Sequence, residues 1–263
     1  MAARLTGKVA VVTGGTRGIG LAIARAMLAE GADVMIASRK ADGVTTALAT
    51  LEAARASAGD AAAGWGRAVG EPCHVGDPAA CIALMQAAEA QLGTVDTLVN
   101  NAGTNPFFGP LTAIDEVAFD KTFEVNLKPA WRLSVLLAKR LAAAKRPGAI
   151  INTASILGER AAPFQGVYGM TKAALISLTQ TLAVELAGQK IRVNAILPGL
   201  VETKLAAAIT GNPALVGSFM NHTALRRPAQ PGEIAGLAVF LASDEASYIT
   251  GAAVPVDGGY LAM

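Results

Sequence analysis

The sequence predicts a single α/β domain of 263 residues, in which a mainly parallel, doubly wound sheet of seven strands carries helices on both faces. Three observations lead to this prediction. Short apolar segments alternate with longer helical segments along the whole chain. The apolar segments lack the polar–apolar alternation of a sheet with one wet face. Polar or glycine-rich motifs follow several apolar segments, as expected when ligands bind outside the carboxyl ends of parallel strands.

The first strand and helix are joined by a glycine-rich turn. Residues 8–13 read Lys-Val-Ala-Val-Val-Thr and predict a strand buried on both sides. Gly14-Gly15-Thr16-Arg17-Gly18-Ile19-Gly20 follows, and an Ala-rich helix is expected to run to about Glu30, before Gly31. Glycines let the backbone approach a pyrophosphate, and a helix N-terminus offers free N–H groups to an anion. The Gly-x-x-x-Gly-x-Gly spacing departs from the usual dinucleotide fingerprint, so its place between a strand and a helix supports the interpretation.

The end of the second strand indicates which dinucleotide the chain prefers. Residues 33–37 predict this strand, and Ser38-Arg39-Lys40 follow it. An acidic residue at this point would bind the ribose hydroxyls of NAD. Here Arg39, with Arg17 from the glycine turn, suits a 2′-phosphate instead. We therefore expect NADP to be preferred over NAD, the alternative being that both arginines are solvated loop residues.

The middle of the chain continues the alternation of helices and strands. The expected elements are a helix over 41–57, a flexible Gly/Ala-rich surface insertion over 58–70, a third strand ending at Cys73-His74-Val75, a helix over 78–91 and a fourth strand over 95–99. Asn100-Asn101-Ala102-Gly103 then suit a ligand-bearing sheet edge, and an aromatic loop over 105–109 follows. A helix from about Ile114 should kink or break beside Asn126, because Pro129 cannot donate to the carbonyl of Val125. Asn126 is then either a satisfied structural group or a site that holds water.

The stretch from Ser155 to Lys172 holds the candidate catalytic groups. Tyr168 and Lys172 are four residues apart in a predicted helix, so their side chains share one face. A nearby ammonium should lower the pKa of the phenol, which makes it a usable proton donor or acceptor. Ser155, after the strand around residues 149–151, could hydrogen-bond the same substrate oxygen. Alternatively, these are a surface pair and an ordinary turn residue.

The last third of the chain completes the predicted sheet. The helix that carries Lys172 should continue to Leu186, with a strand over 191–197 and then Pro198-Gly199. Residues 200–225, with Thr203 near their start, are expected to form a mobile substrate lid. A helix after Pro231 and a last strand over 252–256 follow. Phe107, Phe108, Leu157, Phe164 and the lid could line an apolar pocket or simply pack, and the substrate's identity stays open.

Composition narrows the classes of function. Apolar residues make up 52% of the chain, charged residues 16%, and the formal net charge is +2, so neither a nucleic acid nor a membrane surface is an expected partner. The two cysteines, Cys73 and Cys81, are expected to be buried thiols, and with His74 and His222 they form no metal-ligand cluster. No signal peptide or membrane span is expected, which favours a cytoplasmic protein.

Taken together, these motifs resemble the short-chain dehydrogenase/reductase family along nearly the whole chain. The resemblance rests on residues 13–20, 100–103, Pro198-Gly199 with Thr203, Ser247-Tyr248-Ile249-Thr250-Gly251, Asp257-Gly258-Gly259, and on Asn126, Ser155, Tyr168 and Lys172 in their order and spacing. It implies a Rossmann-type fold in which Tyr168 donates the proton to a carbonyl oxygen. It implies further that Lys172 tunes Tyr168 and binds the nicotinamide ribose, that Ser155 orients the carbonyl, and that Asn126 holds a water.

The resemblance also implies the cofactor site and the assembly. The residues expected to bind the dinucleotide are Gly14, Thr16, Arg17, Gly18, Ile19, Gly20, Ser38, Arg39, His74, Val75, Asn100, Asn101, Ala102, Gly103, Tyr168, Lys172, Pro198, Gly199, Val201 and Thr203. His74 stands where most members have Asp, which puts the adenine contact in doubt. The family usually forms tetramers, so a homotetramer or homodimer is expected.

The reaction that the resemblance favours is NADPH-dependent reduction of an apolar ketone or a 3-oxoacyl thioester, as in carbonyl and 3-oxoacyl reductases. The alternatives are an NAD-linked alcohol dehydrogenase and a non-catalytic dinucleotide-binding sensor or scaffold.

Overall fold

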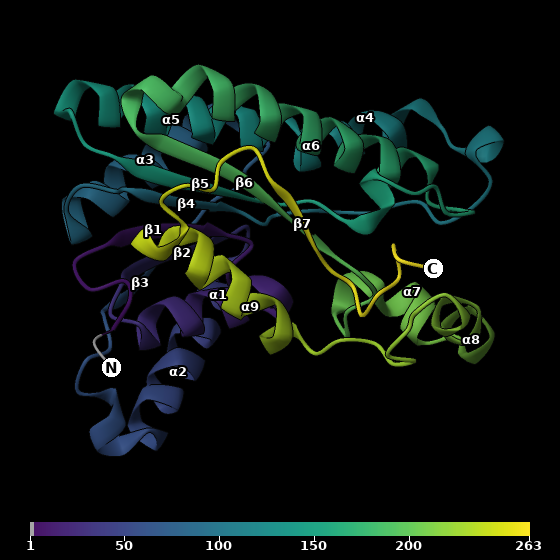
Figure 1. The fold of residues 1–263 in the computed structure, drawn as a ribbon, viewed down its shortest axis with the longest axis horizontal. Coiled ribbons are helices and arrows are strands. Elements are labelled where there is room, and N and C mark those ends of the chain that lie inside the picture. The colour runs from purple at the N-terminus through teal and green to yellow at the C-terminus, as the bar shows by residue number, and fades with distance from the viewer. Residues whose placement is uncertain (1–2) are drawn as a thin grey trace.

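The computed structural model describes residues 3–263 and shows one seven-stranded parallel sheet in the order β3-β2-β1-β4-β5-β6-β7 (Figure 1). The strands are β1 (Val9–Thr13), β2 (Asp33–Ser38), β3 (Ala68–Pro72), β4 (Thr97–Asn100), β5 (Gly148–Thr153), β6 (Ile191–Pro198) and β7 (Ala253–Val256). The chain winds outward from β1 to β3 and then returns to continue from β4 on the other side of β1. The predicted doubly wound sheet is confirmed, and its topological switch point lies between β1 and β4.

Helices cover both faces of this sheet (Figure 1). One layer contains α1 (Gly18–Ala29), α2 (Ala41–Ser57) and α9 (Pro231–Ala242), and the other contains α3 (Pro78–Leu92), α4 (Glu116–Asn126), α5 (Lys128–Ala144) and α6 (Gly166–Leu186). The short helices α7 (Ala207–Thr210) and α8 (Pro213–Asn221) follow β6 and lie to one side of both layers. In residues 3–263 we find no helix that is both long and apolar enough to cross a bilayer.

The central strands are apolar on both faces because each face meets a helical layer. In β1, Ala10 and Val12 join the apolar cluster under α1 and α9, whereas Val9 and Val11 join the cluster under α3 and α5. Successive side chains of a strand point to opposite faces, so a strand between two layers needs apolar residues throughout. The strand sequences therefore lack polar–apolar alternation because both faces of the sheet are buried, as predicted.

Two predictions for residues 58–75 were wrong. The third strand ends at Pro72, because β2 ends at Ser38 and only the bond from Cys73 N–H to the Ser38 carbonyl (2.8 Å) extends the ladder. Cys73-His74-Val75 thus lies in the loop beyond the strand. The supposed insertion over 58–70 already contains the start of β3. It is also tied to the body, since Gly66 N–H donates to the Leu28 carbonyl (2.9 Å).

The predicted single helix from about Ile114 is two helices. α4 ends at Asn126 and α5 begins at Lys128, with Leu127 between them at φ −117° and Pro129 in the first turn of α5. Pro129 has no N–H to offer to the preceding turn, so the helical ladder is interrupted at the predicted place. Of the two predicted outcomes, a kink or a break, the structure therefore shows the break.

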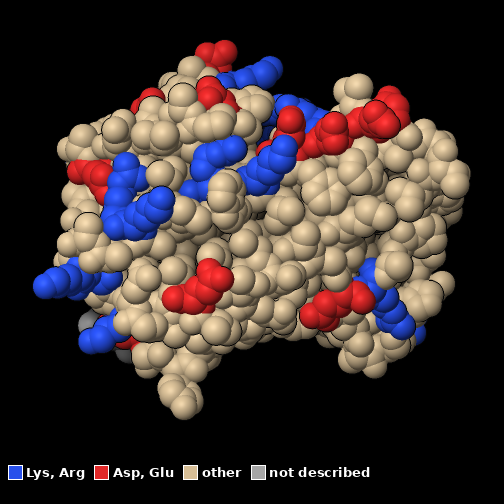
Figure 2. Space-filling view, turned by 90° about the horizontal axis from the view of Figure 1, so that it is seen from above, with Lys and Arg blue, Asp and Glu red and all other residues tan. Residues whose placement is uncertain are grey.

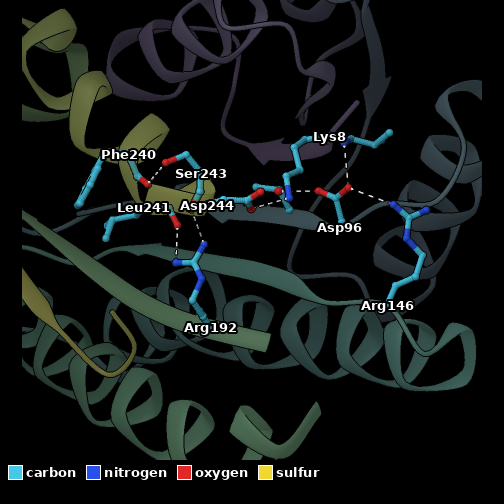
Figure 3. Close-up of polar contacts among 10 residues, drawn as sticks. Lys8, Asp96, Arg146, Arg192, Phe240, Leu241, Ser243 and Asp244 are labelled. Carbon is cyan, nitrogen blue, oxygen red and sulfur yellow. Dashed lines mark hydrogen bonds and ion pairs between the residues drawn. The ribbon is translucent and has the colours of Figure 1, made fainter. Parts of the chain in front are cut away.

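Ion pairs and carbonyl contacts close the amino edge of the sheet (Figure 3). Lys8 Nζ lies 3.1 Å from Asp244 Oδ1, and Arg146 Nη2 lies 3.6 Å from the Oδ2 atom of the buried Asp96. Arg192 donates to the carbonyls of Leu241 (2.8 Å) and Ser243 (3.0 Å). These five charged groups therefore have partners within the protein, and burial raises the pKa of Asp96.

Candidate active site

A cavity of about 140 Å³ lies at the opposite, carboxyl edge of the sheet. It begins at the switch point between β1 and β4, where ligands of doubly wound sheets bind. Many of the predicted site residues line it, together with an apolar end. The predicted ones are Ile19, Asn101, Gly103, Ser155, Tyr168, Lys172, Pro198, Gly199, Val201 and Thr203, and the apolar ones include Phe108, Leu157, Leu200, Leu205, Ile209 and Phe219.

The glycine turn has the backbone that a phosphate-binding turn requires. Gly14 (φ 63°) and Gly18 (φ 53°) are in the left-handed region, which other residues adopt only under strain. A Cβ at Gly20 would collide with the carbonyl oxygen of Gly14, so the helix can approach the turn only because Gly20 has no side chain. No acidic residue lies in the first turn of α1. The N-terminus of α1 therefore remains favourable to an anion.

Thr13 joins the ends of β1 and β4 beside this turn. Its hydroxyl donates to the Val99 carbonyl (3.2 Å) and accepts from the backbone N–H groups of Asn101 (3.0 Å) and Ala102 (3.1 Å). The Asn101 side chain donates back to the carbonyls of Thr13 (3.1 Å) and Gly14 (3.3 Å). These bonds fix the glycine turn against the loop after β4, on opposite sides of the switch point.

Tyr168 and Lys172 lie together on the first two turns of α6, as the spacing predicts. Lys172 Nζ is 5.4 Å from the centre of the Tyr168 ring and donates to the Thr153 carbonyl (2.7 Å) at the end of β5. Ser155 follows β5 and its Oγ accepts from Leu157 N–H (3.1 Å), which orients the hydroxyl at the start of a short turn. All three side chains line the cavity.

Burial sets the proton affinities of this pair, and here the sequence-based expectation was wrong. Lys172 was expected to lower the pKa of Tyr168. Instead, burial raises the pKa of Tyr168 to about 12, against an opposing effect of the Ser155 hydroxyl. Burial also lowers the pKa of Lys172 to about 8. At neutral pH Tyr168 is therefore a protonated phenol beside a Lys172 that still carries its charge.

Asn126 is held at the break between α4 and α5. Its Oδ1 accepts from Thr104 N–H (2.8 Å), and its Nδ2 donates to the Thr104 carbonyl (3.0 Å) and to Thr171 Oγ1 (3.0 Å). Thr171 in turn donates to the Tyr168 carbonyl (2.7 Å). The side chain thus connects α4 to α6 and the loop after β4, which favours the structural alternative for its amide.

Other predicted residues lie around the cavity without lining it. Arg17 and Arg39 are exposed at the ends of β1 and β2, and neither has an ion-pair partner within residues 3–263. Loops at the same edge carry Gly14, Thr16, His74, Val75 and Ala102, whereas Gly18 and Gly20 lie in the first turn of α1 and Ser38 ends β2. Asn100 is not brought to the cavity. It is buried and donates to Ser134 Oγ (3.2 Å) and Asn152 Oδ1 (2.9 Å), which joins β4, β5 and α5.

The sequence motifs do not reveal every polar group at the site. Thr153 lines the cavity, and its buried Oγ1 has no hydrogen-bond partner within the described residues. Gln165, also buried, lines the cavity one turn before Tyr168. Nothing in the local pattern marks either residue, because each depends on which face of its element meets the cavity. The sequence offers one hint of their role, which is that Thr153 lies two residues before Ser155 and Gln165 three residues before Tyr168.

Comparison with known proteins agrees with the geometry over the whole chain. A family model described as enoyl-(acyl carrier protein) reductase matches residues 14–261. Dehydrogenase/reductase SDR family member 4 of Oryctolagus cuniculus is 39% identical over 257 residues, which is 97% of this chain and 94% of the relative.

Solved structures show the same likeness. A short-chain type dehydrogenase/reductase from Mycobacterium ulcerans superposes with a TM-score of 0.91 at 32% identity, covering 98% of this chain and 91% of that one. A structure described as a 2-deoxy-d-gluconate 3-dehydrogenase from Agrobacterium tumefaciens, with bound NADP, gives a TM-score of 0.86 at 33% identity, covering 100% and 99% of the two chains. The chain therefore belongs to the short-chain dehydrogenase/reductase family and is an NAD(P)-dependent oxidoreductase.

Proposed function

We propose that this enzyme reduces a ketone to a secondary alcohol with NADPH, and that Tyr168 donates the proton. The observation that carries the proposal is geometric: Tyr168, Ser155 and Lys172 line one cavity, with Lys172 Nζ 5.4 Å from the centre of the Tyr168 ring. A bound nicotinamide dinucleotide supplies the hydride. The Ser155 hydroxyl binds the carbonyl oxygen and orients it toward the Tyr168 hydroxyl. As that oxygen gains negative charge, the phenol transfers its proton and the ammonium of Lys172 stabilises the phenolate that remains.

The residues around the cavity fit a dinucleotide. The glycine turn and the N-terminus of α1 would hold the pyrophosphate, and the Pro198–Thr203 segment would hold the nicotinamide end. A Cβ at Gly18 would come within 3.1 Å of Thr203 Cγ2, so these two segments already meet. The buried Thr153 Oγ1, which has no partner within residues 3–263, gives the cavity a polar group for a ligand to satisfy.

We propose NADP rather than NAD as the preferred cofactor. Arg39 and Arg17 are exposed beside the carboxyl ends of β2 and β1, with no ion-pair partner in the described part of the chain. Two such guanidinium groups would bind the three oxygens of a 2′-phosphate. The NADP seen with the Agrobacterium tumefaciens relative supports this choice.

The apolar end of the cavity supports an apolar ketone or a 3-oxoacyl thioester as substrate. Phe108, Leu205, Ile209 and Phe219 line this end, where a hydrocarbon chain would exclude water. An NAD-linked alcohol dehydrogenase remains a second candidate within the same site. We propose a homotetramer or homodimer as the assembly. The cytoplasm is the proposed location, supported by the buried free thiols of Cys73 and Cys81.

The test combines cofactor titration with turnover. NADPH and NADH are titrated by fluorescence, and oxidation of the bound cofactor is followed with a panel of ketones that includes a 3-oxoacyl thioester. We expect tighter NADPH binding and turnover of one carbonyl class. In Tyr168→Phe we expect turnover to fall by about 10²–10⁴-fold, because the general acid is lost, while NADPH affinity stays within about twofold. Undiminished turnover in that variant would exclude Tyr168 as the donor.

A further inference from the structure

Residues 200–225, which we call the lid, contact the body of the protein at several points, and one of these contacts is made by an aromatic side chain that also lines the cavity. Within the lid, Leu200, Ile209 and Met220 form a small apolar cluster of their own. Phe219 of α8 packs against this cluster and also against the separate cluster that contains Leu157 and Tyr260. Because Phe219 also lines the cavity, whatever supports its other face helps to set the cavity's depth.

The support for Phe219 comes from the last residues of the sequence. The ring of Tyr260, which is 9% exposed, stacks on the Phe219 ring with 4.7 Å between centroids and 28° between planes. The Tyr260 side chain therefore packs against α8. The preceding glycines have left-handed φ values, 63° at Gly258 and 84° at Gly259, and Asp257 accepts from the backbone N–H groups of Gly259 (2.9 Å) and Leu261 (2.8 Å).

The tail Asp257–Met263 is anchored at both ends. At its start, the Leu225 N–H at the end of the lid donates to the Gly258 carbonyl (3.0 Å). At its far end, Arg160 Nη1 donates to the carbonyl oxygens of Tyr260 (3.2 Å) and Met263 (2.7 Å). The Arg160 guanidinium also lies 5.7 Å from the centre of the Tyr260 ring. Arg160 belongs to the loop between Ser155 and Tyr168, so this one side chain joins the catalytic loop to the tail.

We propose that Arg160 is a positioning residue and Tyr260 a specificity-determining one. Together they hold the tail against the catalytic loop, so that the Tyr260 ring backs Phe219 and fixes how deep a ketone the cavity accepts. The idea that this cavity receives a ketone rests on the proposed function, whereas the contacts among Arg160, Tyr260 and Phe219 do not. Arg160 acts on the substrate only through Tyr260 and Phe219, and neither Arg160 nor Tyr260 takes part in proton transfer.

Hydrogen exchange tests the mechanical part without any substrate. In Tyr260→Ala we expect the amides of α8 to exchange about tenfold faster than in the wild type, with a smaller increase in Arg160→Ala. Tyr260→Phe keeps the stacked ring and loses a hydroxyl that has no hydrogen-bond partner within residues 3–263, so it should match the wild type. Because Arg160 is exposed, its variant should fold even if Tyr260→Ala does not. Unchanged α8 exchange in a folded Arg160→Ala or Tyr260→Ala variant would overturn the proposal.

Kinetics test the specificity part with linear methyl ketones from butanone to octanone. In Tyr260→Ala we expect the octanone-to-butanone ratio of kcat/KM to rise about tenfold, mainly through KM, while the NADPH Kd and the kcat for butanone stay the same. Arg160→Ala should move the ratio in the same direction, and Tyr260→Phe should not move it. A uniform fall in kcat would show an effect on chemistry or folding, and would overturn the specificity role. If the wild type reduces no ketone, the proposed function fails, while the exchange experiment still decides the role of the tail.

Discussion

Lys172 is the residue whose burial most directly affects the proposed chemistry. Its pKa is lowered to about 8, so the ammonium is present below that pH and lost above it, whereas Tyr168 stays protonated to about 12. We therefore expect kcat for ketone reduction to be constant near pH 6–7 and to fall with an apparent pKa of about 8. A pH–rate profile at saturating NADPH measures this. A kcat that stays constant up to pH 10 would contradict the idea that loss of the Lys172 charge causes the fall.

Arg39 offers a second test with a single residue. A guanidinium that binds a 2′-phosphate contributes about 1.5–3 kcal/mol through charged hydrogen bonds, so Arg39→Asp should lower the NADPH-to-NADH ratio of kcat/KM by about tenfold or more. The measurement is that ratio in both enzymes. Arg25→Asp is the matched control, because Arg25 is also exposed but lies within α1, away from the turn. A similar shift in both variants would indicate a general charge effect instead of a phosphate site.

How much of the site the sequence predicts depends on how local each signal is. Tyr168 and Lys172 are four residues apart in one helix, so their common face follows from sequence spacing alone. Their proton affinities do not, because they depend on burial by elements far along the chain. The place of Thr153 in the cavity and the contact between Arg160 and Tyr260 are also not predictable from sequence spacing. The residues concerned are far apart in the sequence and come together only when β5, α8 and the last residues pack.

Among the elements, β1 and β4 meet at the point where the cavity begins, and Thr13 holds their ends. Its Oγ1 accepts from two backbone N–H groups, those of Asn101 and Ala102. In Thr13→Val these donors lose their partner at nearly constant side-chain volume, so we expect the free energy of unfolding to fall by about 1–3 kcal/mol and NADPH to bind more weakly. Urea denaturation and cofactor titration measure the two effects. Thr13→Ser, which keeps the hydroxyl, should retain most of both, and equal losses in the two variants would argue against this role.

Element boundaries show why some predictions succeeded and others did not. The break beside Asn126 was predictable, because Pro129 removes a hydrogen bond whatever surrounds it. The end of β3 was not, because it is set by where its neighbour β2 stops, at Ser38. The Gly/Ala-rich stretch before β3 looked flexible from composition. The hydrogen bond from Gly66 N–H to the Leu28 carbonyl holds it in place, and a contact between residues so far apart cannot be seen in the local sequence pattern.

Across the whole molecule, the two edges of the sheet differ in how their polar groups are satisfied. At the amino edge, Lys8, Asp96 and Arg192 have partners within the protein (Figure 3). At the carboxyl edge, Thr153 Oγ1 has no hydrogen-bond partner among the described residues, and no acidic residue occupies the first turn of α1 after the glycine turn. The polar groups at this second edge come from the ends of β1, β2, β4, β5 and β6, from the loops that follow them and from the start of α6. Because the strands are parallel, their carboxyl ends all lie at one edge of the sheet, and the candidate catalytic residues gather at that edge.

The layer formed by α4, α5 and α6 carries the proposed assembly surface. Figure 2 looks onto this layer and shows a central tract without charged side chains, with most of the lysines and arginines toward one end and acidic groups along its borders. Apolar side chains are exposed on all three helices, at 79% for Val117, 52% for Trp131 and 81% for Val184. A monomer would keep these groups in water, whereas an interface between copies of the chain would bury them.

Trp131→Asp should therefore weaken the assembly. A charge placed in a buried apolar interface is costly to desolvate, and we expect light scattering to show a species smaller than that of the wild type at the same concentration. Ala53→Asp, on an exposed position of α2 in the opposite layer, is the control and should leave the mass unchanged. Because the outer surface of this layer faces away from the sheet, loss of assembly should leave the NADPH Kd of the smaller species within about twofold. A wild type that is monomeric at micromolar concentration, or a Trp131→Asp variant of unchanged mass, would remove this layer from consideration as the interface.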